Sequence, residues 1–154
     1  MANRNFNSKN IKSEFNQKMI DIRRTARVMA GGRRFSFRVA LVAGDGKGSV
    51  GLGVGKGVDV GLASEKALRN AKKNLVKIEL TKNFSISHET SAKFASARVV
   101  IRPAKKGKGI IAGSAVRTVL DLAGIKNAGA KILSRSKNKI NIARATTSAL
   151  AKLK

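Results

Sequence analysis

Several residue types that carry chemistry are missing or scarce in this chain of 154 residues. It has no cysteine, which excludes disulfides, thiol catalysis and cysteine-based zinc sites. Its single histidine, His88, has no nearby carboxylate except Glu89, and only eight acidic residues are scattered along the sequence. Acid–base catalysis and carboxylate metal sites therefore have little to work with. We predict that the protein is not an enzyme and uses no cofactor or metal.

Long apolar runs and large aromatic side chains are also missing. The longest apolar stretches fall far short of a membrane span, and the N-terminal sequence MANRNFNSKN has no apolar segment of the kind found in secretory signals. We therefore predict no membrane partner. Tyr and Trp are absent and there are only six Phe, so stacking on single-stranded nucleic acid is expected to be a minor contribution.

What the chain has in excess is positive charge. It carries 33 Lys and Arg against 8 Asp and Glu, for a net charge of +25, yet 42% of its residues are hydrophobic, enough for a core. Self-repulsion at this charge opposes a compact state unless a polyanion binds. The charge is divided, with +11 in residues 1–80 and +14 in residues 81–154, so both halves are expected to contact the polyanion. Folded RNA, recognised by shape and phosphate, fits best.

Periodicity and turn residues predict an α+β protein of two small two-layer domains. A flexible basic segment is predicted at 1–13, a first domain at 14–80 and a second domain at 81–154. The first domain is predicted as α-β-β-β-α, with a short helix at 14–19, strands near 20–28, 35–41 and 50–57, and a helix at 58–78. The second is predicted as β-β-α-β-α, with strands near 84–89, 97–102 and 128–134, a helix at 114–123 and a last helix capped by Asn141.

The third strand of the first domain alternates apolar residues with glycine. Val50, Leu52 and Val54 are expected to face the core, and the opposite face is made of glycines from Gly51 to Gly57. Glycine weakens a strand, so another backbone or a ligand is expected to approach closely there. A purely structural role and a thin face that admits an RNA backbone both remain open.

The glycine-rich segment also matches a nucleotide-binding pattern. Residues 46–51 (GKGSVG) fit G-x-G-x-x-G, but a strand follows them, whereas the dinucleotide fingerprint needs a helix there. The phosphate-binding loop of nucleotide hydrolases fails too, because Gly57 stands where a Ser or Thr is required after Lys56. A nucleotide-using enzyme, such as a small kinase, would also need an acid cluster for magnesium, which the sequence does not show.

Two groups of basic residues are the candidate RNA-binding sites. The first lies in residues 23–56, where Asp45 is the only acidic residue: Arg23, Arg24, Arg27, Arg33, Arg34, Arg38, Lys47 and Lys56. The second lies in residues 98–117, without an acidic residue: Arg98, Arg102, Lys105, Lys106, Lys108 and Arg117. The peptide N–H groups of Gly107, Gly109 and Gly113 are expected to add phosphate donors. A solvated face and a mobile surface loop are the alternatives; since a solvated face normally mixes charges, phosphate contact is favoured.

Two long motifs resemble a known family. Residues 31–37 (GGRRFSF) and 44–56 (GDGKGSVGLGVGK) resemble the signature of bacterial-type ribosomal protein five of the small subunit. Residues 102–104 (RPA), 107–113 (GKGIIAG), 119–124 (VLDLAG) and 141–146 (NIARAT) are similar to that family's C-terminal domain. The resemblance implies a double-stranded-RNA-binding-like domain followed by a domain with a left-handed crossover.

The resemblance also implies partners and a place of action. Members of this family bind 16S rRNA, neighbour small-subunit proteins four and eight, and help subunit assembly and decoding accuracy near the path by which mRNA enters. The loop that contains Gly31 and Gly32 would reach toward the neck of the subunit, which adds both glycines to the predicted RNA-binding residues. The implied location is the cytoplasmic ribosome. The alternative is a free regulatory RNA-binding protein.

Overall fold

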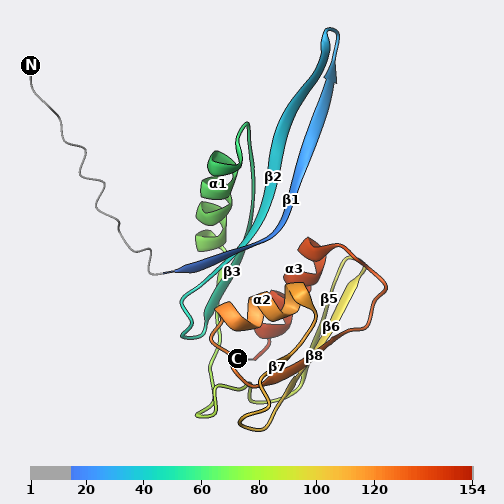
Figure 1. Cartoon of the computed structure of the whole chain (residues 1–154). Coiled ribbons are helices and arrows are strands. Elements are labelled where there is room, and N and C mark those ends of the chain that lie inside the picture. The colour runs from blue at the N-terminus through green and yellow to red at the C-terminus, as the bar shows by residue number, and fades with distance from the viewer. Residues whose placement is uncertain (1–14, 154) are drawn as a thin grey trace, which may run out of the picture.

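Two four-stranded sheets and three helices make up the part of the chain that this computed structural model describes, residues 15–153 (Figure 1). The first unit contains β1 (Asn16–Met29), β2 (Gly32–Gly44), β3 (Ser49–Gly57), α1 (Val60–Lys73) and β4 (Leu75–Lys77). The second contains β5 (Thr90–Phe94), β6 (Ala97–Pro103), β7 (Ile110–Ile111), α2 (Ser114–Leu122), β8 (Ala128–Ile132) and α3 (Lys139–Leu150). The predicted α+β class with two small sheet-containing units is confirmed.

The first sheet is an antiparallel meander in the order β1-β2-β3-β4, and α1 covers one of its faces. The helix begins after Asp59, whose carboxylate accepts a hydrogen bond from the Gly61 N–H at 3.2 Å. Its buried residues, Ala63, Ala67 and Ala71, recur every four positions, so only methyl groups separate the helix from the sheet.

The glycine face of β3 is what allows this close packing. A Cβ at Gly51 would meet the carbonyl oxygen of Ala71, and one at Gly53 would meet that of Ala67. Of the two roles left open for this face, the alternative that it admits an RNA backbone is wrong, because α1 covers the face. The close approach inferred from the glycines is real, but the backbone that approaches is the protein's own.

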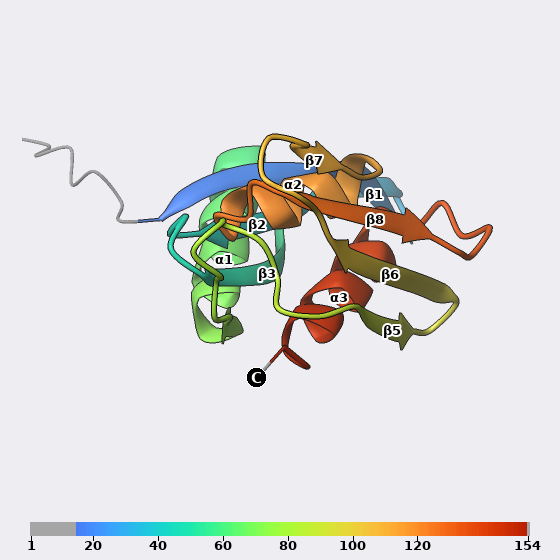
Figure 2. The same cartoon turned by 90° about the horizontal axis from the view of Figure 1, so that it is seen from below.

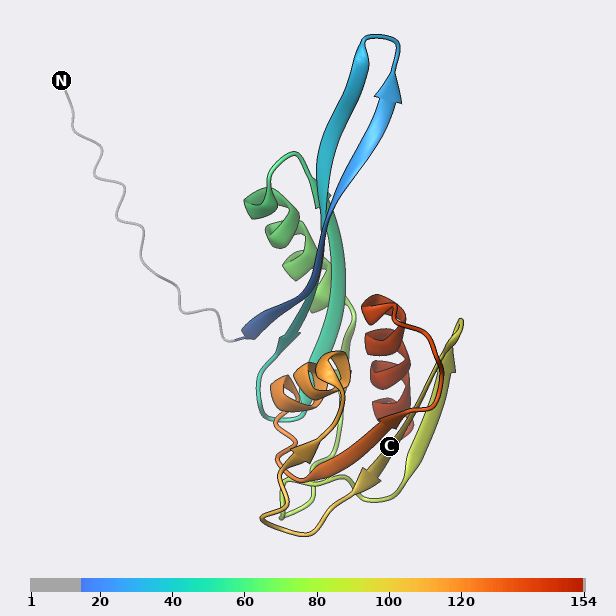
Figure 3. The same cartoon turned by 45° about the vertical axis from the view of Figure 1, so that its right-hand side comes forward.

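The opposite face of the first sheet packs against the second unit. Val42, Val50 and Leu52 share one buried cluster with Val116 and Leu120 of α2. The loop between β2 and β3 closes this seam, since the Gly46 N–H donates to the Leu122 carbonyl at 3.1 Å and the Gly48 N–H donates to the Ala123 carbonyl at 2.9 Å. The first sheet therefore lies between α1 and the helices of the second unit (Figure 3).

Beyond this core, β1 and β2 continue as a two-stranded projection, which we call the hairpin arm (residues 22–38) (Figures 1 and 3). Pairing runs without a break from Asp21 to Met29, and a two-residue turn joins Met29 to Gly32. The prediction of a half-buried strand near 20–28 is wrong for the arm, because Val28 is 76% exposed and Ile22 is 49% exposed.

The second sheet has the order β5-β6-β8-β7, with β7 and β8 parallel and joined through α2. The connection from β7 through α2 to β8 is the crossover that the family resemblance implied, and its left-handedness stays a prediction. Both α2 and α3 pack on one face, whereas no described helix covers the other, and Figure 2 shows this arrangement. We call the uncovered side the open face of the second sheet.

Some predicted elements are wrong. Strand β1 occupies most of the helix predicted at 14–19, because residues from Asn16 pair with β2. Helix α1 ends at Lys73 and not at residue 78, since Leu75, Val76 and Lys77 pair with β3. The region predicted as a strand at 84–89 contains bends and no strand. Asn138, not Asn141, caps α3 by accepting from the Ile140 N–H at 3.1 Å. The prediction for residues 1–13 lies outside the described residues, and the domain boundary at 80 stays a prediction.

Candidate nucleic-acid interface

One side of the hairpin arm, together with the adjoining end of β3, carries a continuous set of basic side chains. Arg27 pairs with Arg34 across β1 and β2, and Arg23 pairs with Arg38, which in turn pairs with Lys56 of β3. Directly paired residues in antiparallel strands point to the same side of the sheet. We call this set of five residues the arginine face. It lies on the same side of the first sheet as Val42, Val50 and Leu52. Those residues pack against the second unit, nearer to the core than the arm.

The arginine face is electrostatically unfavourable by itself, because like charges directly opposite each other destabilise a strand pair. Within the described residues, Arg23 is the only member that has a carboxylate within ion-pair distance, with its Nε 2.9 Å from Oδ2 of Asp21. The Thr25 and Ser36 hydroxyls lie 2.8 Å apart between the two arginine rows. A row of phosphates would supply the missing negative charge.

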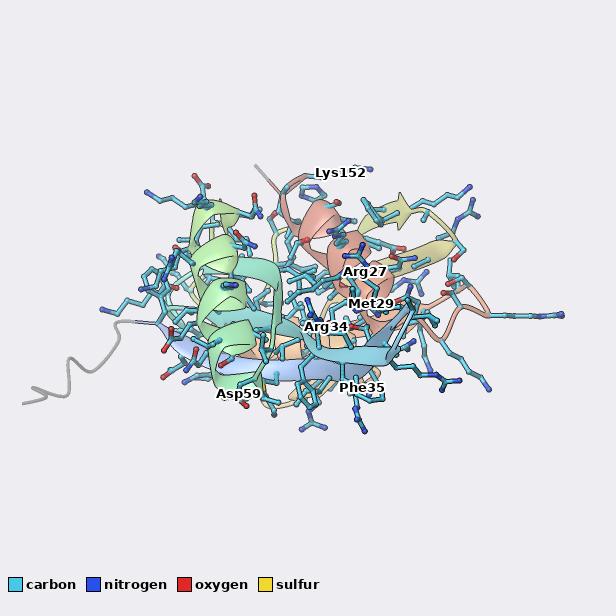
Figure 4. The ribbon with its side chains drawn as sticks, turned by 90° about the horizontal axis from the view of Figure 1, so that it is seen from above. Arg27, Met29, Arg34, Phe35, Asp59 and Lys152 are labelled. Atoms are coloured by element: carbon cyan, nitrogen blue, oxygen red, sulfur yellow. The ribbon has the colours of Figure 1, made fainter. Side chains whose placement is uncertain are left out.

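The other side of the arm is mixed. Arg24 and Arg33 point this way, together with Phe35, whose ring centroid lies 3.6 Å from the Cζ of Arg24. Figure 4 shows Arg27 and Arg34 on one side of the arm and Phe35 on the other. The six arginines predicted in residues 23–38 are thus brought onto one arm, but onto two different faces.

The remaining residues of the first group lie at the ends of β2. Gly31 and Gly32 form the tip, where nothing would meet an added Cβ and Gly32 has a φ of 136°. Lys47 lies at the opposite end, in the loop beside α2, and so is separated from the arginine face.

Asp45 organises the loop that contains Lys47. Its carboxylate accepts the N–H groups of Lys47 at 2.8 Å and Ser49 at 2.9 Å. Burial favours the neutral acid, but these backbone hydrogen bonds together outweigh it and hold the pKa of Asp45 below its ordinary value. The only acidic residue of the segment is therefore structural.

The second basic group is only partly brought together. Arg102 and Lys108 line one hollow on the open face of the second sheet, whereas Arg117 lines a different hollow beside Asp121 and Gly124. Arg102 also pairs with Glu89, with its Nε 3.0 Å from Oε2. Lys105 and Lys106 are exposed in the loop between β6 and β7.

The expectation that Gly107 and Gly109 offer their N–H groups to phosphate is wrong. Both N–H groups donate to Oδ1 of Asn127, at 3.1 and 3.3 Å. The side-chain amide of Asn127 donates in turn to the Asn83 carbonyl at 2.8 Å. Gly113 caps the start of α2. The basic loop is therefore held by these hydrogen bonds, and it offers an anion its exposed lysine side chains rather than the N–H groups of Gly107 and Gly109.

Two further basic residues join this group in space. Lys93 pairs directly with Arg98 across β5 and β6, and Lys131 of β8 pairs with Val100 on the same side. Lys93 and Lys131 were not among the predicted site residues. The alternation of basic with buried residues in these strands is the signal that could have identified them.

Catalytic and metal sites find no support in the part of the chain that the structure describes. His88 is exposed, and its Nδ1 lies 2.9 Å from the hydroxyl of Ser87. No group of three or more His, Cys, Asp or Glu that could hold a metal occurs among the described residues. None of the described helices combines the length and apolar character that a membrane crossing requires.

Comparison with known proteins identifies the family. Residues 15–79 match the family described as ribosomal protein S5, N-terminal domain, and residues 92–154 match ribosomal protein S5, C-terminal domain. The small ribosomal subunit protein uS5 of Thermosynechococcus vestitus is 46% identical over 100% of this chain and 89% of its own length. That of Synechocystis is 47% identical over 100% and 90%, and uS5c of Rhodomonas salina is 46% identical over 92% and 84%. The chain belongs to the ribosomal protein S5 family.

Proposed function

We propose that this chain, a structural and non-enzymatic component of the small ribosomal subunit, clamps 16S rRNA through its two basic groups. The residues proposed to contact RNA are Arg23, Arg24, Arg27, Gly31, Gly32, Arg33, Arg34, Arg38, Lys47, Lys56, Arg102, Lys105, Lys106, Lys108 and Arg117. The arm would meet one RNA segment and the second unit another. Family membership does not favour the alternative, a free regulatory RNA-binding protein.

The observation that carries this proposal is the arginine face. Arg27 stands opposite Arg34, and Arg23 stands opposite Arg38. The arm that carries them also exposes apolar side chains such as Val28, so it contributes little to the core. A face made only for solvation mixes charges of both signs, because that avoids repulsion. Arginine offers a planar fork that matches phosphate oxygens. The arm is therefore well suited to a phosphate backbone, held by charge and shape rather than by base sequence.

The finer assignments of partner and place rest on the family resemblance. We propose that the protein neighbours are small-subunit proteins four and eight, and that the chain acts in subunit assembly and accuracy near the path by which mRNA enters. The open face of the second sheet supports a protein neighbour. It contains a hollow of about 430 Å³ whose lining includes Val100, Ile111 and Leu133, and Leu133 is 60% exposed.

A salt titration tests the RNA clamp. If about eight phosphates are neutralised, the logarithm of the binding constant for folded 16S rRNA fragments should fall with the logarithm of salt concentration at a slope of roughly −6 to −7. The double variant Arg27→Gln, Arg34→Gln should reduce the magnitude of the slope by about 1 to 2. Arg69→Gln, an exposed change on α1, is the matched control and should leave the slope nearly unchanged. A slope near zero for the unmodified chain would exclude the clamp.

A separate observation distinguishes the ribosomal component from a free RNA-binding protein. A structural component should sediment with small subunits after a high-salt wash, whereas a free regulator bound by charge should be released. Recovery of the chain only in the soluble fraction would contradict the proposal.

A further inference from the structure

The hairpin arm has a short stretch of open strand edge. Strand β3 pairs with β2 only from Phe37 to Gly44, because β3 ends at Gly57 opposite Phe37. The N–H of Asp45 donates to the Ser49 carbonyl at 3.1 Å, which shows that odd-numbered residues along β2 direct their peptide groups toward β3. By the same alternation, Phe35 directs its peptide N–H and C=O to that edge. Within the described residues, no strand lies opposite to accept them.

A groove lies beside this open edge. Its volume is about 430 Å³, within the range of roughly 300–1,000 Å³ that is usual for small-ligand sites. The lining residues come from both strands of the arm and from the segment after β3: Arg27, Arg34, Phe35, Ser36 and Val58. Phe35 is 43% exposed and Val58 is 79% exposed, so an aromatic and an aliphatic side chain border a peptide donor and acceptor.

The aromatic wall of the groove contacts a cation on one face. The Cζ of Arg24 lies 3.6 Å from the centroid of the Phe35 ring and covers that face, so a base would stack on the other face of the ring. Arg27 and Arg34 border the same groove from the arginine face, which in Figure 4 is the side of the arm opposite Phe35. The groove thus combines an aromatic ring, a peptide donor and acceptor, and two guanidinium groups.

We propose that this groove binds one unpaired nucleobase of a folded RNA. The base would stack on Phe35 and hydrogen-bond through its edge to the peptide groups of Phe35, while Arg27 and Arg34 contact the flanking phosphates. This inference rests on the proposed function, because it requires the arm to lie on RNA. Phe is the only large aromatic residue type in the chain, so the composition suggests little stacking on bases. The proposed site would make one Phe an exception.

An added peptide strand is the competing occupant of an open edge, and the geometry disfavours it. Only the stretch from Gly32 to Ser36 lies beyond β3, and Val58 borders the groove there. By the alternation above, only Arg33 and Phe35 of this stretch direct their peptide groups to the open edge, whereas the addition of a peptide strand uses several peptide groups of the edge strand. The two guanidinium groups also favour an anionic chain over an ordinary peptide.

The test compares two RNA duplexes of equal length with the full chain at one salt concentration. One duplex carries a single bulged 2-aminopurine, and the other is fully paired. The bulged duplex should bind roughly tenfold more tightly, and the fluorescence of its bulged base should fall as the base stacks on a ring. Phe35→Leu, which keeps an apolar side chain, should remove most of this preference while leaving binding to the paired duplex nearly unchanged.

Phe84→Leu is the matched control. Phe84 is 47% exposed and also has a cation above its ring, Lys126 at 4.6 Å, but it lies outside the groove. This variant should keep the tenfold preference. Equal binding of both duplexes by the unmodified chain, or an unchanged preference in Phe35→Leu, would overturn the nucleobase site while leaving the phosphate clamp intact. Failure to bind either duplex would instead overturn the proposed function, and this inference with it.

Discussion

Gly53 of β3 lies directly against the backbone of Ala67 in α1, with no room for a side chain between them. Gly51 and Gly55 stand in the same relation to Ala71 and Ala63. Gly53→Ala should therefore force the helix away from the sheet and lower the free energy of unfolding by about 1–3 kcal/mol or more. Urea unfolding followed by circular dichroism measures the change.

The control for this variant is another strand glycine. Gly129 of β8 has no heavy atom within 4 Å of an added Cβ, and it lacks a positive φ. Gly129→Ala should leave stability nearly unchanged or raise it slightly, because alanine restricts the unfolded chain. If both variants lose equal stability, the close packing of α1 on β3 is not the cause.

Asp45 should make folding sensitive to acid. Its pKa is lowered in the folded protein from an ordinary value near 3.8, so the ionised carboxylate stabilises the fold above that pH. This contribution is lost as the pH falls through the lower, folded value. Asp45→Asn should therefore reduce the free energy of unfolding at neutral pH, and its difference from the unmodified chain should shrink in acid below the folded pKa. Unfolding midpoints in denaturant, measured across this pH range, test the expectation.

Lys47→Ala is the control for this prediction, because it removes the positive charge next to the Asp45 carboxylate. The substitution keeps the peptide N–H that donates to Asp45 at 2.8 Å, so the acid dependence should be retained. A flat pH profile for Lys47→Ala would show instead that the lysine side chain is responsible.

Asn127 should control the rigidity of the basic loop. Its side chain is buried and accepts from Gly107 and Gly109, so Asn127→Ala leaves these N–H groups and the Asn83 carbonyl without their partner. We expect a loss of about 1–3 kcal/mol in the free energy of unfolding, with faster hydrogen exchange at both glycines. Asn138→Ala, which removes the cap of α3, should destabilise the protein without accelerating exchange in the loop.

The arginine face should cost stability when no RNA is present. Arg34→Thr removes one member of the Arg27–Arg34 pair and places a strand-favouring residue in β2, so it should stabilise the free protein by about 0.2–1 kcal/mol at low salt. The gain should shrink as salt screens the repulsion. Thermal unfolding at two salt concentrations is the measurement.

Arg24→Thr is the corresponding change on the other side of the arm. Arg24 lies over Phe35, so its removal loses a favourable contact and should bring no gain. Equal stabilisation by both variants would mean that the total charge of the chain, and not the pairing of Arg27 with Arg34, opposes folding.

The sequence predicted local features well where one physical cause dominated. Alternation and the glycine-rich turn at 44–48 located β2 and β3, and Pro103 and Gly124 marked the ends of β6 and α2 correctly. Leu75 and Ile78 fit the period of the preceding helix, but pairing of Leu75 with Gly51 places it in a strand. Such pairing depends on distant residues, so local periodicity does not reveal it.

The same limit applies to the candidate site. The sequence identified the arginines of residues 23–38, because their excess over acidic residues is visible in the chain. It did not reveal that Phe35 borders an open strand edge, because this depends on where β3 ends relative to β2. The role of Asn127 was also hidden, since Asn127 lies 20 residues from Gly107 in the chain.

The shared core across the two units has a consequence for synthesis. Val42, Val50 and Leu52 leave the translating ribosome about 70 residues before Val119 and Leu120, which help to cover them. At roughly 5–20 residues per second, the nascent first unit would keep this apolar surface uncovered for on the order of ten seconds. During that time its basic arm is already complete. The newly made protein is therefore most exposed to aggregation at the moment when it already displays every arginine of the hairpin arm.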